Sequence, residues 1–328
     1  MKVIFVGTGD IGLPALQWLV EDPQTDLVAV VCQPDKPAGR QQILTPPKTK
    51  ELASASGVPV RQPARIGDDL AFFRGAGPDV IVVMAYGQIL PEGILAAPRL
   101  ACLNLHASLL PEYRGASPIQ AAIRDGKSTT GITVIYMDQG LDTGDILLAD
   151  SLEIAPDETG QSLHDRLAAL APRSLQRALG RLAAGSAPRT PQSETGASHC
   201  RKLNRKDGAI DWSRPAVEIE RWIRAYHPWP GTATTWVDGP DRSDGSGHRK
   251  MLKVFPPVGV GPSPPPTTPT QHPTLPGTVL STGPAGIAVA TGQGAIFLRS
   301  LQLEGRRRML SEDFMKGNPL PANARFGC

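Results

Sequence analysis

Two stretches of the chain, Cys102-Leu-Asn-Leu-His106 and Leu141-Asp-Thr-Gly-Asp-Ile146, place polar side chains among apolar, strand-forming residues. Residues two apart in a strand point to the same face, so Asn104 and His106 are predicted to project side by side. An amide and an imidazole can hold a developing oxyanion and move one proton. The carboxylate of Asp142 would fix the imidazole tautomer and favour its charged form. Neither Asn104 nor His106 offers a covalent nucleophile, so the pattern indicates acyl transfer by direct attack of a substrate amine.

The strand that carries Asn104 is one of several short apolar runs that define the fold. These runs are rich in Val and Ile and are separated by segments with helical patterning, which indicates a parallel sheet with crossover helices. We predict an α/β fold with a Rossmann-like catalytic domain over residues 1–185, closed by a helix over Gln161–Leu182 that Pro172 breaks or kinks. The expected strands are Lys2–Gly7, Leu27–Gln33, Asp79–Tyr86, Ala101–His106, Ile132–Met137 and Ile146–Ile154.

A second, smaller domain is predicted over residues 207–328, after a linker over residues 186–206 that is rich in Gly, Ser, Pro and Thr. A helix is expected over Pro215–Ala225, followed by a small β domain. Residues 256–276 hold nine prolines and no charged side chain, so we expect a mobile surface insertion there. The expected strands are Gly277–Leu280, Ile287–Ala290 and Ala295–Leu301.

Length and charge also separate the two parts. At 328 residues the chain exceeds a typical single domain. Residues 1–200 carry 17 basic and 21 acidic side chains (net −4), whereas residues 201–328 carry 17 and 10 (net +7). This asymmetry points either to a polyanionic partner, most simply nucleic acid, or to a solvated basic surface.

Cysteine usage and hydropathy argue against secreted and membrane classes. The cysteines at positions 32, 102, 200 and 328 have neither zinc-site spacing nor the density of a disulfide scaffold. The apolar run Val28–Cys32 is too short to cross a bilayer, and the N-terminus has the pattern of a strand. We therefore expect a cytoplasmic protein with reduced cysteines, no membrane association and no metal.

The segment Gly7-Thr-Gly-Asp-Ile-Gly12 fits the G-x-G-x-x-G pattern and follows a predicted strand, which makes a dinucleotide-binding dehydrogenase an alternative. Such an enzyme needs an acidic residue near the end of the second strand, and here Cys32-Gln33 stand there, with Asp35 in the turn beyond. Hydride transfer also has no need of Asn104, His106 and Asp142. We therefore interpret the glycines as a tight turn with close helix packing.

The stretches His106-Ala-Ser-Leu-Leu-Pro-Glu-Tyr-Arg-Gly-Ala-Ser-Pro-Ile-Gln120 and Met137-Asp-Gln-Gly-Leu-Asp-Thr-Gly-Asp145 resemble the folate-dependent formyltransferases, in particular the branch that acts on methionyl-tRNA. The resemblance implies catalytic roles for Asn104, His106 and Asp142. It also implies 10-formyltetrahydrofolate as co-substrate and an open β-barrel of oligonucleotide-binding type for the second domain. The implied folate-contacting residues are Ser108, Leu109, Leu110 and Pro111, and the segment Tyr86, Gly87, Gln88, Ile89 and Leu90, in which Ile89 and Leu90 would supply apolar walls.

The same resemblance implies initiator methionyl-tRNA as the partner. In this branch the loop that begins at Gln33 reaches the acceptor end of the tRNA, so Arg40 is the candidate for contacting the terminal base pair or its phosphates. The cations Lys202, Arg205 and Lys206 are further candidates for tRNA contacts. We expect the protein to be a monomer.

Two other functions remain open on the sequence. The same catalytic residues would serve a formyltransferase that acts on a small amine, such as an amino sugar nucleotide or glycinamide ribonucleotide, although such a substrate does not require the basic second domain. A non-catalytic nucleic-acid-binding protein on a degenerate Rossmann scaffold would bind without folate turnover.

Overall fold

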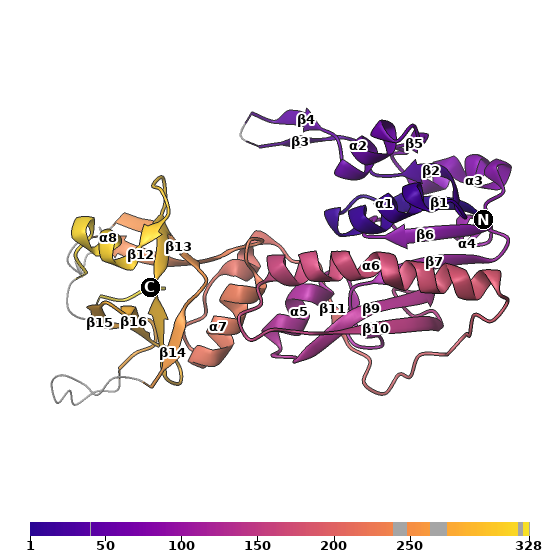
Figure 1. Cartoon of the computed structure of the whole chain (residues 1–328). Coiled ribbons are helices and arrows are strands. Elements are labelled where there is room, and N and C mark those ends of the chain that lie inside the picture. The colour runs from indigo at the N-terminus through magenta and orange to yellow at the C-terminus, as the bar shows by residue number, and fades with distance from the viewer. Residues whose placement is uncertain (40, 239–247, 263–273, 321–323, 328) are drawn as a thin grey trace. The chain divides into compact units, whose positions relative to one another are not determined.

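The computed structural model describes residues 1–39, 41–238, 248–262, 274–320 and 324–327 (Figure 1). The chain divides into two compact units, each of which takes segments that are distant in sequence. The first unit consists of Met1–Pro118, Thr129–Glu153 and Leu163–Arg201, and the second of Ile119–Ser128, Ile154–Ser162 and Lys202–Cys328. Residues 186–201, which form most of the expected linker, therefore lie in the first unit.

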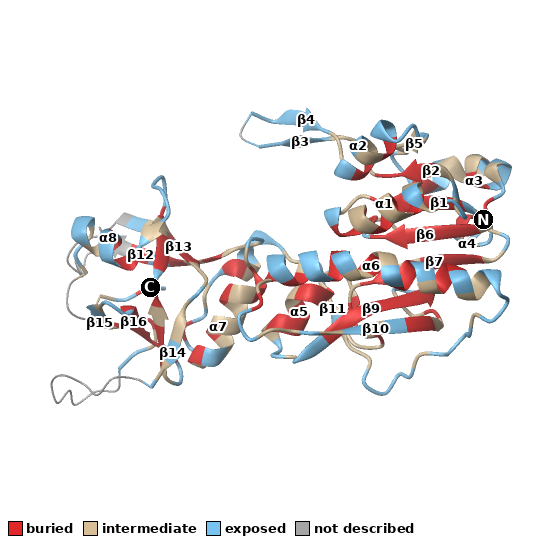
Figure 2. Ribbon diagram, viewed as in Figure 1, coloured by how far each residue is buried: buried red, intermediate tan, exposed pale blue. Residues whose placement is uncertain are grey.

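The first unit is built on a seven-stranded sheet with the strand order β10-β9-β7-β6-β1-β2-β5. Strands β7, β6, β1, β2 and β5 are parallel, and β9 and β10 extend one edge in antiparallel orientation. The middle strands are buried nearly throughout, as Figure 2 shows for β6 and β7, which explains their unbroken apolar runs. The predicted Rossmann-like, parallel-rich sheet is confirmed. Its strands are β1 (Lys2–Gly7), β2 (Asp26–Val31), β5 (Val60–Arg61), β6 (Val80–Met84), β7 (Ala101–His106), β9 (Thr129–Tyr136) and β10 (Ile146–Glu153).

The crossover segments of the first unit contain short helices and two small strand pairs. Helix α1 follows the glycine loop, and Leu16 and Leu19 on it are fully or almost fully buried. The helical elements are η1 (Asp10–Gly12), α1 (Leu13–Glu21), α2 (Lys48–Ala55), η2 (Ile66–Asp69), α3 (Leu70–Ala76) and α4 (Glu92–Leu95), and the paired strands are β3 (Lys36–Ala38) with β4 (Ile43–Thr45) and β8 (Arg114–Gly115) with β11 (His199–Cys200).

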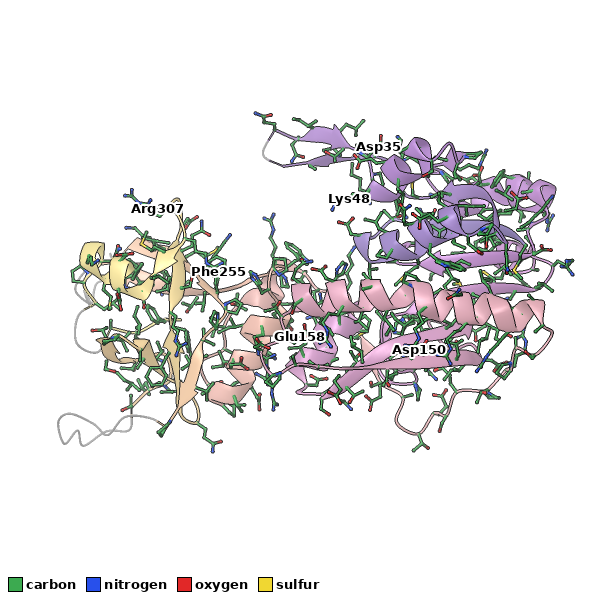
Figure 3. The ribbon with its side chains drawn as sticks, viewed as in Figure 1. Asp35, Lys48, Asp150, Glu158, Phe255 and Arg307 are labelled. Atoms are coloured by element: carbon green, nitrogen blue, oxygen red, sulfur yellow. The ribbon has the colours of Figure 1, made fainter. Side chains whose placement is uncertain are left out.

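Helix α6 (Gly160–Ala183) is the long helix expected from the leucine pattern. Its buried leucines, 163, 167, 175 and 179, recur with the helical period and form one apolar face. On β10, Asp150 accepts a 2.8 Å hydrogen bond from Ser174 Oγ and forms an ion pair with Arg177, so the helix is also tied to the sheet by polar contacts (Figure 3).

Pro172 lies inside α6, and the helix continues past it. Of the break or kink expected at Pro172, the break is therefore wrong. A proline costs a helix one hydrogen bond and a steric clash, about 3 kcal/mol. The buried face on both sides of Pro172 offsets this cost, since each fully buried leucine contributes about 1.5–3 kcal/mol.

The second unit contains two four-stranded antiparallel sheets, in the orders β12-β13-β18-β19 and β14-β17-β16-β15. Both sheets contribute to one apolar core, which includes the aromatic residues Trp212, Trp236, Phe314 and Phe326. The predicted small β domain is confirmed. Its elements are α5 (Pro118–Arg124), η3 (Arg205–Gly208), α7 (Ala216–Ala225), β12 (Thr232–Asp238), β13 (His248–Phe255), β14 (Gly259–Gly261), β15 (Val279–Gly283), β16 (Gly286–Ala290), β17 (Ala295–Leu298), β18 (Ser300–Leu303), β19 (Met309–Leu310) and α8 (Ser311–Gly317).

Two expectations for this unit need correction. The single strand expected over Ala295–Leu301 is two strands, because the chain passes at the exposed Arg299 from β17 in one sheet to β18 in the other. Within the proline-rich stretch, Gly259–Gly261 form strand β14 and pair with β17, so an unstructured insertion is wrong for these residues. They contain no proline, so their backbone N–H groups remain available for pairing. Residues 263–273 of the insertion lie outside the described part of the chain.

Across the described residues, the helices are too short or too polar for any of them to span a lipid bilayer.

Candidate active site

Asn104 and His106 lie near the carboxyl end of β7, between β6 and β9. Asn104 stands opposite Val83 and Ile135, and His106 stands opposite Thr133. Asn104 is half-buried and His106 is buried. Ligand sites of open α/β sheets lie outside the carboxyl ends of the strands, so both side chains occupy the edge at which a site is expected.

Asp142 reaches these two residues from the turn between β9 and β10. One of its carboxylate oxygens accepts a 3.0 Å hydrogen bond from Asn104 Nδ2. The other lies 3.4 Å from His106 Nδ1 and accepts a 2.8 Å hydrogen bond from the backbone N–H of Gly115. The structure thus brings together the three residues in which the sequence analysis expects the chemistry.

The His106 ring is held on both sides by oxygen acceptors. Its Nε2 lies 2.9 Å from the backbone oxygen of Tyr113, and its Nδ1 faces the Asp142 carboxylate. A neutral imidazole can donate from only one nitrogen, whereas an imidazolium can donate from both. Both ring nitrogens therefore face an oxygen that can accept a hydrogen bond.

The backbone of the Asp142 turn has an unusual conformation. Asp142 has a φ of 56°, in the left-handed region that non-glycine residues rarely adopt. Its carboxylate is nevertheless well anchored, with an exposed side-chain fraction of 12%. Strained backbone of this kind persists where the surrounding contacts determine it, and it is concentrated at functional sites.

The segment after His106 folds back as a compact turn. The Ser108 hydroxyl donates a 2.6 Å hydrogen bond to the carbonyl of Glu112, and Thr133 Oγ1 on β9 donates to the carbonyl of Ser108 at 2.6 Å. The N–H of Leu110 donates in turn to Thr133 Oγ1 at 3.1 Å. Ser108 and Leu110 are buried, whereas Leu109 and Pro111 keep part of their surface exposed and are the better placed of the four expected folate contacts.

The segment expected to line the folate pocket leaves the end of β6, next to β7. Its side chains fall into two groups. Ile89 is 79% exposed, as suits an apolar wall that a ligand would cover, whereas Leu90 is 2% exposed and belongs to the core. Gln88 is engaged locally, because its Oε1 accepts from the N–H of Ile66 and its Nε2 donates to the carbonyl of Ala64. Gly87, with a φ of 88°, exposes its backbone.

Tyr86 is buried, and its hydroxyl has no hydrogen-bond partner among the described residues. Burial raises the pKa of its phenol to about 12. Tyr86 packs in the same core as Leu90, so its side chain acts there as an apolar group.

The glycine loop of residues 7–12 engages several of its backbone donors within the protein. The N–H groups of Thr8 and Gly9 both donate to the carbonyl of Ala85, at 3.2 and 3.0 Å. A Cβ on Gly7 would lie 2.5 Å from the Phe5 ring, and one on Gly9 would lie 2.9 Å from Ala85 Cβ. These glycines permit close packing of backbone against β6. This close packing agrees with the tight turn expected from the sequence.

Part of the expected linker contributes to the catalytic region. The Gln192 amide donates to the carbonyls of Asp142 and Gly144, both at 2.8 Å, and accepts from Arg114 Nε at 3.0 Å. Ser198 accepts a 2.9 Å hydrogen bond from the N–H of Tyr113 at its hydroxyl. These residues were not predicted from the sequence, because a polar stretch without a hydrophobic period gives no local signal of such contacts.

The expected tRNA contacts are distributed over both units. Arg40 lies outside the described residues, and the hairpin of β3 and β4 on either side of it presents the exposed apolar residues Ile43 and Leu44. The ion pairs Asp35–Lys50 and Asp10–Lys48 tie down the chain at the base of this hairpin. Figure 3 labels Asp35 and Lys48. The Lys50 ammonium, with Gln62, lowers the pKa of the Asp35 carboxyl.

Lys202, Arg205 and Lys206 are exposed and belong to the second unit, whereas the catalytic candidates belong to the first. Asn204 caps the short helix η3 by accepting a 2.9 Å hydrogen bond from the N–H of Lys206, and this fixes the backbone from which two of these cations project.

Comparison with known protein families gives one result for the whole chain. The family model described as "Formyl transferase" matches residues 1–179, and that described as "Formyl transferase, C-terminal domain" matches residues 202–319. The methionyl-tRNA formyltransferase of Geobacter metallireducens is 41% identical over 329 residues, covering 100% of this chain and 99% of the relative. That of Akkermansia muciniphila is 42% identical over 321 residues, covering 97% of each chain.

Solved structures share the fold at low sequence identity. The N-formyltransferase from Helicobacter canadensis, solved with folinic acid and dTDP-3-aminofucose, has a TM-score of 0.62 and 15% identity, and the match covers 91% of this chain and 98% of that one. The sugar 3N-formyltransferase WlaRD, solved with dTDP and 5-N-formyl-THF, has a TM-score of 0.61 and 15% identity, and the match covers 94% and 99%. At this identity the similarity establishes the fold.

Proposed function

The chain belongs to the formyltransferase family, and we propose that it transfers the formyl group of 10-formyltetrahydrofolate to the α-amino group of initiator methionyl-tRNA. The observation that carries the proposal is the convergence of the Asn104 amide, the His106 ring and the Asp142 carboxylate within hydrogen-bonding reach of one another. The choice of acceptor is supported by relatives of the same length, about 40% identical, that are named for methionyl-tRNA.

The acceptor amine has to be neutral when it attacks. An α-amino group has an ordinary pKa of about 7.7–8.0, far below that of a lysine side chain, so a substantial neutral fraction exists near neutral pH. The active site therefore needs no strong base to create the nucleophile. Its task is to bring the amine to the formyl carbon and to accept one proton as the new bond forms.

Asn104 and His106 would stabilise the negative charge that develops on the formyl oxygen. The Asn104 amide nitrogen has two N–H bonds. Among the described residues it donates to Asp142, and the second N–H would serve the oxyanion. His106 Nε2 lies next to the Tyr113 carbonyl. To donate to the formyl oxygen, it would have to leave this carbonyl and bond to the formyl oxygen instead. Asp142 would hold His106 charged and help to take the proton of the amine, directly or through water.

Collapse of the tetrahedral intermediate completes the transfer. The bond between the formyl carbon and the folate nitrogen breaks, and that nitrogen takes a proton from His106 or water, which balances the proton lost by the amine. Tetrahydrofolate and the N-formylated aminoacyl-tRNA are the products. The reaction is addition of the amine to the formyl carbon followed by elimination of the folate nitrogen, and these side chains or water carry the accompanying protons.

The second unit would bind the tRNA. Residues 201–328 carry a net charge of +7, and the exposed Lys202, Arg205 and Lys206 lie at the start of this unit. Binding of a polyanion by such cations releases counterions and depends strongly on salt concentration. Arg40 would act at the acceptor end, on the first unit.

The proposal is tested by incubating the purified protein with 10-formyltetrahydrofolate and charged initiator tRNA, and by following both tetrahydrofolate release and formylmethionyl-tRNA. Parallel reactions contain an amino sugar nucleotide or glycinamide ribonucleotide in place of the tRNA. Formylation of a small amine, with methionyl-tRNA left unmodified, would refute the choice of acceptor. Binding of tRNA without any folate turnover would refute the enzyme assignment.

A further inference from the structure

The segment over residues 190–200, called the strap below, packs directly on the turns that carry the catalytic candidates. Its backbone is fixed at both ends within the first unit. Thr190 exchanges two backbone hydrogen bonds with Ile146, and His199–Cys200 form β11, which pairs with β8. The strap therefore has the composition of a linker, but its backbone makes specific hydrogen bonds.

Gln192 is the residue of the strap that contacts the Asp142 turn. Its side-chain nitrogen donates to the carbonyls of Asp142 and Gly144, and both distances are 2.8 Å. Its side-chain oxygen accepts from Arg114 Nε at 3.0 Å. Both donors and the acceptor of one amide are thus used, which is the requirement for an amide that determines the position of its neighbours.

Arg114 completes the link. It is 2% exposed, and its guanidinium is held by Gln192 and by the carboxylate of Glu194. The residues on either side of it touch the catalytic candidates, because the Tyr113 carbonyl faces His106 Nε2 and the Gly115 N–H donates to Asp142. The Arg114 side chain thereby joins the segment that orients His106 to the turn that carries Asp142.

We infer that Gln192, together with Arg114, positions the Asp142 carboxylate against His106 and Asn104 and is required for the chemical step. The inference rests on the proposed function. Asp142 has a left-handed backbone conformation, and the two carbonyls that Gln192 binds lie within and just after this strained turn. Without these contacts the turn can relax, which moves the carboxylate away from the ring. Gln192 touches no reacting atom in this scheme, so it is a positioning residue.

The test compares Gln192→Glu and Gln192→Ala with Gln176→Ala, an exposed glutamine on α6 that serves as the matched control. Gln192→Glu keeps the acceptor for Arg114 but places a carboxylate against two carbonyl oxygens, so it removes the positioning contacts while retaining size. Both Gln192 variants should lower the single-turnover formylation rate by about ten- to a hundredfold at saturating methionyl-tRNA and 10-formyltetrahydrofolate. The Kd for tRNA should change less than about twofold, and Gln176→Ala should match the wild type.

Two further measurements distinguish a positioning role of Gln192 from a purely structural one. The pH profile of the single-turnover rate should shift in Gln192→Ala, which introduces no charge, in the same direction as in Asp142→Asn. When Gln192→Ala and Asp142→Asn are combined, the single-turnover rate should fall no further than in Asp142→Asn alone. A residue that acts through Asp142 has nothing to position once the carboxylate is gone. A normal rate in a folded Gln192→Glu protein, or losses that simply multiply in the double variant, would overturn the inference.

Failure of the proposed function would look different. In that case the wild type itself would not formylate methionyl-tRNA, and the same variants would be compared on whichever amine the wild type does formylate.

Discussion

Two glycine-containing loops, one after β1 and one between β9 and β10, use their polar groups in opposite ways. In the loop of residues 7–12, the N–H groups of Thr8 and Gly9 are both taken up by the carbonyl of Ala85. In the turn before β10, Asp142 directs its carboxylate to Asn104 and His106. The first loop matches the widespread G-x-G-x-x-G pattern, whereas the second loop matches no pattern that is equally widespread. The partners of the polar groups, rather than the glycines, therefore indicate where the chemistry lies.

The largest effects are expected at the residues that Asp142 meets. Asn104→Ala and His106→Ala should each lower formylation by about a hundredfold or more, because each removes a contact made to the transition state. Affinity for tRNA should stay near that of the wild type. The measurement is the single-turnover rate together with the Kd for tRNA, and near-normal turnover in both variants would show that the chemistry lies elsewhere.

Asp142→Asn sharpens the comparison at the turn itself. The substitution keeps the shape of the side chain but removes the charge that faces His106 Nδ1 at 3.4 Å. Activity should fall sharply, and its dependence on pH should change, because the proposed mechanism needs a carboxylate beside the His106 ring. A rate and pH profile identical to those of the wild type would mean that Asp142 is only a turn residue.

A pair of glycine variants compares the two loops directly. A Cβ on Gly7 would lie 2.5 Å from the Phe5 ring and 2.7 Å from the carbonyl of Met84, so Gly7→Ala should lower stability by about 1–3 kcal/mol. The rate per folded molecule should remain close to that of the wild type.

A Cβ on Gly144 would lie 1.7 Å from the carbonyl of Tyr136. Because displacement of this turn moves Asp142, Gly144→Ala should lower both stability and rate. Urea unfolding and single-turnover kinetics on the same preparations distinguish these outcomes.

The sequence was informative where a feature is local. The alternation in Ala101–His106 predicts the strand and the common face of Asn104 and His106, and the structure has the strand with the same bounds. Gln192 could not be predicted in this way, because its contacts with Asp142 and Gly144 join residues 50 and 48 positions apart. The change of sheet at Arg299 was missed for a similar reason, since an apolar run does not say which neighbouring strand each residue will pair with.

The smallest expected effect concerns Tyr86, which follows the residue that receives both donors of the glycine loop. Its buried hydroxyl has no partner among the residues that the structure describes, so Tyr86→Phe should leave stability near neutral pH unchanged or slightly higher. The pKa of this phenol is raised from 10.0 to about 12, so the unfolded chain loses the proton first as pH rises. Tyr86 therefore favours unfolding progressively between about pH 10 and 12, and the variant should lose less stability than the wild type across this interval.

Tyr226→Phe is the matched control, because the Tyr226 hydroxyl interacts with Arg124 and its removal should cost about 0.5–1.5 kcal/mol. Urea unfolding of the three proteins at pH 7 and at pH 11 gives the comparison, and a loss at Tyr86 as large as that at Tyr226 would show that its hydroxyl is bonded in solution.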